Sequence, residues 1–102
     1  MSQVIREYKI PTGSEFELEL PMGNSLLYIT VKKTVNDETS TVEEQPAMYF
    51  LVNDDTDITE TRKYKVYQAE TPIGSLEMYA GTFMFNRGQF AYHLFEVFTT
   101  SD

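Results

Sequence analysis

The sequence predicts an all-β fold, a single antiparallel β-sandwich or partly open barrel of about seven short strands. Three observations support this prediction. Several segments alternate apolar and polar residues with a period of two, turn residues separate them at regular spacing, and no segment of ten or more residues has the apolar spacing of a helix. The 102 residues are expected to form one domain, residues 1–102, with a polar acidic loop at residues 34–45.

Two strands are predicted near the N-terminus. The segment 3–10 alternates loosely and is followed by Pro-Thr-Gly, which breaks a strand. The segment 14–20 (SEFELEL) alternates perfectly, so its phenylalanine and leucines face one way while Glu15, Glu17 and Glu19 face the other. This period of two is typical of a half-buried strand.

Two further strands are predicted in the middle of the chain. The turn PMGN leads into residues 26–33, which are rich in β-branched and aromatic residues. Residues 34–45 (TVNDETSTVEEQ) have no apolar periodicity, and we expect a mobile polar loop there. Residues 47–52 (AMYFLV) are apolar on both faces, as expected of a central strand.

Residues 62–68, 78–85 and 90–98 are the three strands predicted in the C-terminal half. The last two are joined by a hairpin turn at residues 86–89, with Gly88 in the left-handed conformation. The strand 90–98 is apolar on both faces, so it is a central strand, is covered by loops, or takes part in an oligomer contact. The expected interface residues are Tyr92, His93, Phe95 and Phe98.

The composition disfavours several classes of function. Sixteen acidic residues against eight basic ones give a net charge of −8, which disfavours binding to nucleic acid. The chain has no cysteine, so disulfides, thiolate nucleophiles and cysteine-ligated zinc are excluded. It has neither an apolar run of the ~18 residues needed to span a membrane nor a signal pattern in MSQVIREYKI. We therefore expect a soluble, cytoplasmic protein.

The first eight residues of the stretch NDDTDITETRKYK include four acidic ones and are open to two interpretations. Asn53, Asp55 and Asp57 alternate like the first ligands of a calcium loop. The sixth and twelfth positions are Ile58 and Tyr64, however, where an EF-hand loop needs Gly and Glu. We therefore expect a hairpin connection between the flanking strands, with Asp and Asn bonding their own backbone, and no metal ion.

The basic half of the same stretch supplies the candidate ligand-binding residues, Arg62, Lys63, Lys65 and Tyr67. On a strand, Lys63, Lys65 and Tyr67 share one face and Arg62 points the opposite way. Such a cationic-aromatic patch is able to hold a phosphate or a nucleotide-like anion. Lysine supplies a positive point charge, and the tyrosine ring supplies a surface on which a base can stack. Alternatively, the lysines pair across strands with glutamates of the segment 14–20.

The single histidine, His93, does not indicate a catalytic site. It lies in mid-strand among aromatic residues, without the nucleophile elbow of a serine hydrolase. Carboxylate pairs occur, but no sequence feature selects one for acid–base work. We predict no catalytic residue and no cofactor, and favour a binding protein over an enzyme.

The segment YAGTFMFNRGQFAYHLFE, Tyr79 to Glu96, resembles a pattern in a family of short phage and prophage proteins of unknown function. That pattern is an aromatic residue, Gly-Thr-Phe, a Gly-containing turn and an aromatic-His-aliphatic-Phe-Glu end. REYKIP, LELPMGNSLLYITV, MYFLVNDD and TRKYKVY stand in the expected order, so the resemblance covers nearly the whole chain. Family members often carry Gly-Thr-Gly-His-Pro where this chain has QAETP at residues 68–72, without the second histidine.

The resemblance implies a phage or prophage accessory protein that acts by binding in the cytoplasm of the infected host cell. Our first hypothesis is an oligomer that sequesters a small anionic ligand, a nucleotide-derived defence signal. The second is an acidic inhibitor, similar to a nucleic-acid mimic, that covers a basic surface of a host defence enzyme. The third is a minor virion structural protein. No membrane partner and no direct contact with nucleic acid are expected.

Overall fold

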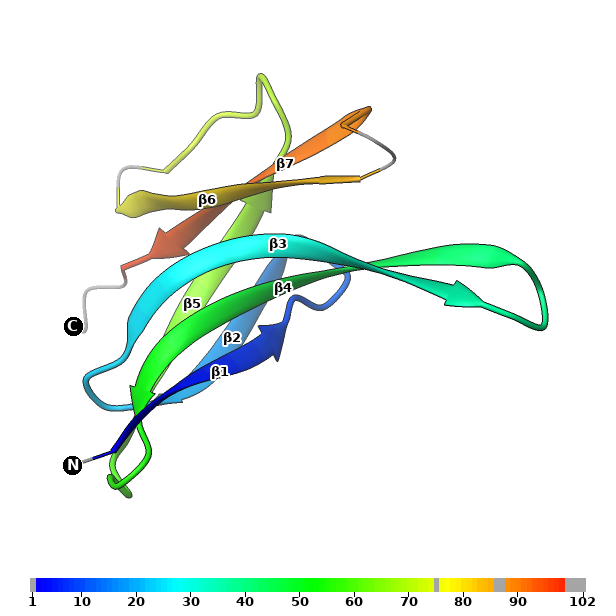
Figure 1. The fold of residues 1–102 in the computed structure, drawn as a ribbon. Helices are drawn as coiled ribbons and strands as arrows, with labels where there is room; N and C mark the ends of the chain where they lie inside the picture. The colour runs from blue at the N-terminus through cyan, green and yellow to red at the C-terminus, as the bar shows by residue number, and fades with distance from the viewer. Residues whose placement is uncertain (1, 75, 86–87, 99–102) are drawn as a thin grey trace.

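The computed structural model describes residues 2–74, 76–85 and 88–98. They contain seven strands: β1 (Gln3–Lys9), β2 (Glu15–Pro21), β3 (Ser25–Asn36), β4 (Thr41–Asn53), β5 (Thr59–Tyr67), β6 (Glu77–Phe85) and β7 (Phe90–Val97). The strands form two antiparallel sheets, in the orders β1-β4-β3 and β2-β5-β7-β6, which lie one over the other (Figure 1). The predicted all-β sandwich of about seven strands is confirmed, and within the described residues the sheets do not close into a barrel.

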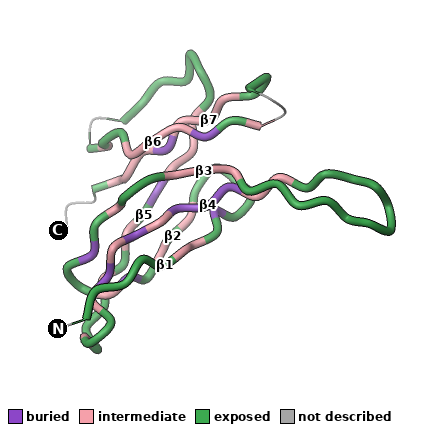
Figure 2. Tube along the Cα trace, viewed as in Figure 1, coloured by how far each residue is buried: buried purple, intermediate pink, exposed green. Residues whose placement is uncertain are grey.

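The core lies between the two sheets, and buried stretches occur on strands of both (Figure 2). It follows the alternation of the sequence: on β2, Leu20 is fully buried, while Glu15, Glu17 and Glu19 on the other side of the strand are exposed. The core cluster is completed from both sheets by Ile10, Met48, Phe50, Val52, Tyr64, Phe83 and Leu94. Burial of these side chains is the main favourable contribution to the stability of the sandwich.

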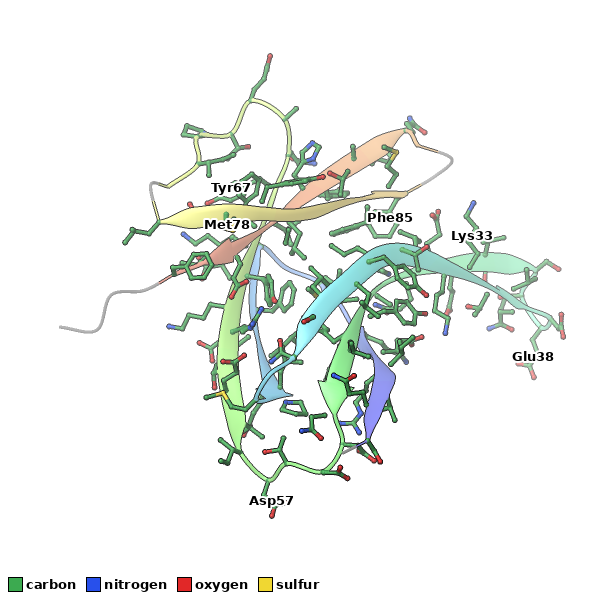
Figure 3. The ribbon with its side chains drawn as sticks, turned by 60° about the vertical axis from the view of Figure 1, so that its left-hand side comes forward. Lys33, Glu38, Asp57, Tyr67, Met78 and Phe85 are labelled. Atoms are coloured by element: carbon green, nitrogen blue, oxygen red, sulfur yellow. The ribbon has the colours of Figure 1, made fainter. Side chains whose placement is uncertain are left out.

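Residues 34–45 are not the loop that the sequence suggested. The hairpin of β3 and β4 continues beyond the sandwich, with Val35 opposite Val42 and Asn36 opposite Thr41, and only the turn between them lacks strand structure (Figures 1 and 3). Residues 32–43 are all exposed. The strand ladder forms through backbone hydrogen bonds, which do not require buried side chains, so apolar periodicity could not reveal this part of the strands.

The acidic connection after β4 is also different from the prediction. β4 and β5 belong to different sheets, so residues 54–58 cross from one layer to the other and do not close a hairpin. The expected turn chemistry is confirmed, since the side-chain oxygen of Asn53 accepts a hydrogen bond from the backbone N–H of Asp55 at 3.0 Å. Asp54 forms an ion pair with Arg6 of β1 at 2.7 Å, which ties this crossover to the three-stranded sheet.

β7 is a central strand of its sheet, between β5 and β6. Of the explanations offered for its two apolar faces, this central position is the one that the structure supports directly. The turn before β7 contains Gly88 with φ of 86°, as predicted, whereas Asn86 and Arg87 lie outside the described residues. β6 approaches β3 of the other sheet closely, because a Cβ added at Gly81 would come within 2.4 Å of the side chain of Ile29.

Candidate functional site

Three of the four predicted ligand-binding residues lie together on the outer face of the four-stranded sheet. Lys63, Lys65 and Tyr67 follow one another along β5 on the side away from the core, whereas buried Tyr64 faces inward. Strand register then places two ring side chains of β7 beside them, with Phe95 opposite Lys65 and His93 opposite Tyr67. We call this surface, made of Lys63, Lys65, Tyr67, His93 and Phe95, the outer β5–β7 face.

The two lysines of this face are paired with glutamates, but loosely. Lys63 Nζ lies 3.6 Å from Glu17 Oε1, and Lys65 Nζ lies 3.7 Å from Glu15 Oε1. These cross-strand pairs are the alternative that the sequence left open. Both distances exceed the length of an N–H···O hydrogen bond, and exposed pairs of this kind contribute only about 0–1 kcal/mol. The ammonium groups therefore keep donors that face solvent.

A cluster of rings lies beside the lysines. Phe95 packs against Tyr67 and Tyr79 edge to face, with ring centroids 5.5 and 5.6 Å apart. The Tyr67 hydroxyl donates to Glu77 Oε1 at 2.5 Å, and this hydrogen bond raises the pKa of Tyr67. Glu77 also accepts a hydrogen bond from the backbone N–H of Gly74, so the ring of Tyr67 is held in place across Phe95.

His93 takes part in a short chain of polar contacts at the same face. Its Nδ1 lies 2.9 Å from Thr82 Oγ1, and Thr82 Oγ1 lies 2.6 Å from the Tyr79 hydroxyl. The contact with Thr82 fixes the orientation of the imidazole ring on the sheet surface. The chain of contacts positions Tyr79, which is more than half exposed, beside Phe95.

A shallow hollow marks the lysine end of this face. It has a volume of 450 Å³ and is lined by Glu15, Phe16, Glu17, Lys63, Tyr64, Lys65 and Val97. Val97 of β7 faces Lys63 across the sheet and provides the apolar part of the outer wall. The hollow therefore joins two ammonium groups, two carboxylates and an apolar surface that continues to Phe95.

Arg62, the fourth predicted residue, does not belong to this face. It points inward, as its position on the strand indicated, and pairs with Glu60 at 3.1 Å and with Glu96 at 3.5 Å. Burial raises the pKa of Glu96, against the opposing effect of Arg62. Burial likewise raises the pKa of Tyr64 to about 12. Arg62 is thus part of a half-buried polar group on the inner side of the sheet and is not available to a ligand on the outer face.

The predicted interface residues are divided between the two sides of β7. His93 and Phe95 lie on the outer face, and Phe98 follows the strand and is exposed. Tyr92 faces the interior, where its ring stacks on Phe83 at 5.7 Å, so it lies on the opposite side of the strand from His93 and Phe95. The period-two alternation of the strand explains this division.

The sequence reasoning missed the partners that complete the outer β5–β7 face. Glu77, Tyr79 and Thr82 come from β6, which follows β7 in the order of the sheet. Their alternation on β6 is interrupted between Tyr79 and Gly81, where the register shifts by one residue. A bulge of this kind is invisible to a period-two pattern, because two residues on one strand then oppose one on the other.

Fold and site together define a small antiparallel β-sandwich whose four-stranded sheet carries a cationic-aromatic outer face. The chain belongs to the family described as a domain of unknown function, DUF7352, whose model matches residues 1–101. No curated protein and no solved structure matches the chain. In the part of the chain that the structure describes, no helix could span a membrane and no group of three or more histidine, aspartate or glutamate side chains is placed to hold a metal ion.

Proposed function

We propose that this chain is a non-enzymatic binding protein that holds a small anionic ligand with an aromatic ring on the outer β5–β7 face. The observation that carries the proposal is the loose pairing of Lys63 and Lys65, at 3.6 and 3.7 Å from their glutamates, beside the rings of Tyr67 and Phe95. An anionic group of a ligand replaces weak pairs at small cost, and an aromatic ring packs on the adjacent aromatic surface.

The nature of the ligand follows from the two chemistries that this face combines. Charge neutralisation by two lysines and stacking on tyrosine or phenylalanine suit a nucleotide, which carries both phosphate and a flat base. The resemblance to short phage proteins extends the proposal to a nucleotide-derived defence signal, sequestered in the cytoplasm of an infected cell. The proposal includes an oligomer, with exposed Phe98 and half-buried His93 as candidates for the contact between copies.

Binding of a panel of mononucleotides and cyclic dinucleotides tests this proposal, with isothermal titration calorimetry as the measurement. The variant Lys63→Gln with Lys65→Gln is expected to weaken binding by about tenfold or more, because two charge-assisted contacts are lost. The matched control is Lys9→Gln with Lys33→Gln, which removes the same charge from the other sheet. Equal loss in both double variants would show that only net charge matters, and the named site would be wrong.

Native mass spectrometry of protein purified from phage-infected cells gives an independent test. The proposal predicts an oligomer that retains a ligand of a few nucleotides or less, and the lysine double variant is expected to lose that ligand. A monomer without ligand would contradict sequestration and favour a protein partner.

A second candidate function rests on the β3–β4 hairpin. Its exposed tip carries Asp37, Glu38 and Glu43, and it extends beyond the sandwich (Figure 3). A projecting acidic ribbon suits contact with a basic surface on a host enzyme. Replacing the three carboxylates with amides is expected to abolish inhibition of such an enzyme and its salt dependence, while nucleotide binding on the outer β5–β7 face is retained. Unchanged inhibition would exclude the hairpin as the contact.

A further inference from the structure

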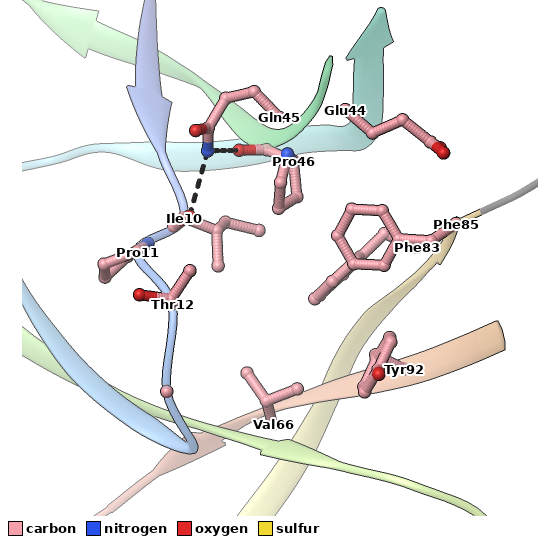
Figure 4. Close-up of a pocket in the computed structure, with 11 residues that line it drawn as sticks. Ile10, Pro11, Thr12, Glu44, Gln45, Pro46, Val66, Phe83, Phe85 and Tyr92 are labelled. Atoms are coloured by element: carbon pink, nitrogen blue, oxygen red, sulfur yellow. Dashed lines mark hydrogen bonds between the residues drawn. The ribbon is translucent and has the colours of Figure 1, made fainter. Parts of the chain in front are cut away.

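A cavity lies between the two sheets, at the end of the sandwich where the β3–β4 hairpin leaves it (Figure 4). Its volume is 260 Å³. The walls come from the connection between β1 and β2, from β4, and from β5, β6 and β7 of the other sheet. The lining residues are Ile10, Pro11, Thr12, Gly13, Glu44, Gln45, Pro46, Val66, Phe83, Phe85 and Tyr92.

One wall of the cavity consists of three aromatic rings. Phe83 and Tyr92 stack at 5.7 Å with an interplanar angle of 21°, and Phe85 meets Phe83 and Tyr92 edge to face at 5.7 and 5.6 Å. Each ring thus contacts the two others. Such a cluster offers both ring faces and ring edges to a further ring placed in the cavity, which are the favourable geometries for aromatic pairs.

The opposite wall is apolar and held firmly. Ile10 and Pro46 are buried, and the backbone N–H of Ile10 donates to the carbonyl of Pro46 at 2.9 Å. The Gln45 side-chain amide donates to the carbonyls of Ile10 and Pro46 at 3.0 and 2.7 Å (Figure 4). These bonds fasten the chain after β1 to β4, so the wall is formed before any ligand arrives. A preformed wall lowers the entropic cost of binding.

The size and polarity of the cavity restrict the ligand. An apolar cavity of about 150 Å³ stays dry and binds benzene, so a volume of 260 Å³ accommodates a ring system somewhat larger than benzene. The lining residues include no lysine or arginine, and the chain has a net charge of −8, so an anion is disfavoured. The polar side chains that line the cavity are those of Thr12, Glu44, Gln45 and Tyr92. The Thr12 and Tyr92 hydroxyls can orient an uncharged ligand by hydrogen bonds, and the Glu44 carboxylate further disfavours an anion.

We propose that this inter-sheet cavity binds a small, neutral, planar aromatic molecule, with its ring against Phe83, Phe85 and Tyr92. This site is separate from the outer β5–β7 face, because Val66 and Tyr92 lie on the inner side of the same strands. It takes an uncharged ring, whereas the outer face is proposed to take an anion.

Indole is a suitable probe, because the chain has no tryptophan. Excitation at the red edge of the indole absorption, where the seven tyrosines do not absorb, makes the emission report on the added molecule. Titration of indole with the 102-residue chain is expected to give a saturable blue shift of its emission, as water around the ring is replaced by apolar side chains. The variant Val66→Phe places a ring in the cavity and is expected to weaken indole binding by about tenfold or more. Val42→Phe, the same exchange at an exposed valine of the hairpin, is the control and is expected to bind as the wild type does.

Circular dichroism and thermal unfolding establish that each variant is folded. If Val66→Phe does not fold, Phe85→Leu removes one ring of the aromatic wall and keeps an apolar side chain, and weaker indole binding is again expected. An emission that does not saturate with wild-type protein would overturn the proposal. Equal affinity in the wild type and in a folded Val66→Phe or Phe85→Leu variant would do the same.

Discussion

On the outer face of the three-stranded sheet, Lys32 donates to Glu7 at 2.8 Å, and the Tyr49 hydroxyl donates to the same carboxylate oxygen at 2.7 Å. On the outer face of the four-stranded sheet, Lys63 and Lys65 stay 3.6 and 3.7 Å from their carboxylates. The two faces thus carry the same kinds of side chain, but Lys32 is hydrogen-bonded to its carboxylate, whereas Lys63 and Lys65 lie beyond hydrogen-bond distance of theirs. The difference identifies which lysines are available to a ligand.

The hydrogen bonds between Glu7, Lys32 and Tyr49 shift the pKa values of these side chains. Lys32 and the Tyr49 hydroxyl lower the pKa of Glu7, and Glu7 raises the pKa of Lys32. The ring of Tyr49 stacks on Tyr28 at 4.5 Å, which orients its hydroxyl toward Glu7. A ligand anion that approached Lys32 would have to displace a carboxylate that makes two hydrogen bonds, whereas no such cost arises at Lys63.

The largest expected effect is on the free energy of unfolding, because the aromatic rings of the two faces are packed to different extents. Phe95→Ala removes a half-buried ring and its contacts with two tyrosines, and is expected to lower the free energy of unfolding by about 2–3 kcal/mol. Tyr28→Ala removes a more exposed ring with one stacked partner, and is expected to cost about 1 kcal/mol. Urea unfolding measures both. A larger loss for Tyr28→Ala would mean that rings do not hold the four-stranded face together.

The next effect is on the pH dependence of stability, which is expected to differ between the carboxylates of the two faces. Because the folded-state pKa of Glu7 is lowered, its contribution to stability is present above the unfolded-state value and is lost as the pH falls through the folded-state value. Glu7→Gln is therefore expected to destabilise the protein at neutral pH and to reduce the loss of stability in acid. Glu17→Gln serves as the matched exchange on the other sheet. The free energy of unfolding is measured against pH for both variants. Identical profiles would contradict the contrast between the hydrogen-bonded pair of Glu7 with Lys32 and the looser pair of Glu17 with Lys63.

Glu96, on the inner side of the four-stranded sheet, is expected to show the opposite dependence on pH. Burial raises its folded-state pKa, so its contribution to stability is present below the unfolded-state value and is lost as the pH rises through the folded-state value. Glu96→Gln is therefore expected to be more stable than the wild type at neutral pH, with the difference shrinking as the pH falls toward the unfolded-state value. Unfolding curves at several pH values measure this, and a variant less stable at neutral pH would show that the pair with Arg62 outweighs burial.

Much of the fold could be predicted from sequence, because alternation reports which face of a strand is buried. The pattern in residues 14–20 correctly separated Leu20 from the three glutamates, and the apolar run in β4 correctly indicated a central strand. Alternation does not report which strand pairs with which. The crossover at residues 54–58 therefore looked like a hairpin turn, although it connects the two sheets.

The candidate site could be predicted only in part, for the same reason. Placement of Lys63, Lys65 and Tyr67 on one strand face follows from a period of two. Their neighbours Glu77 and Tyr79 are brought in by the order of the sheet and by the bulge in β6. The inter-sheet cavity unites residues as distant in sequence as Ile10 and Tyr92, so no local pattern could indicate it.

The reaction of lysine side chains with a limiting amount of acetic anhydride tests most directly whether the two faces differ as described. The side chains of Lys32 and Lys63 are equally exposed, at 49% each, so access does not distinguish them. Lys32 is hydrogen-bonded and its pKa is raised, which reduces the fraction of reactive neutral amine. Peptide mass spectrometry of the folded protein is expected to show faster acetylation at Lys63 than at Lys32. Equal rates, or faster acetylation at Lys32, would contradict the claim that the lysines of the outer β5–β7 face are the available ones.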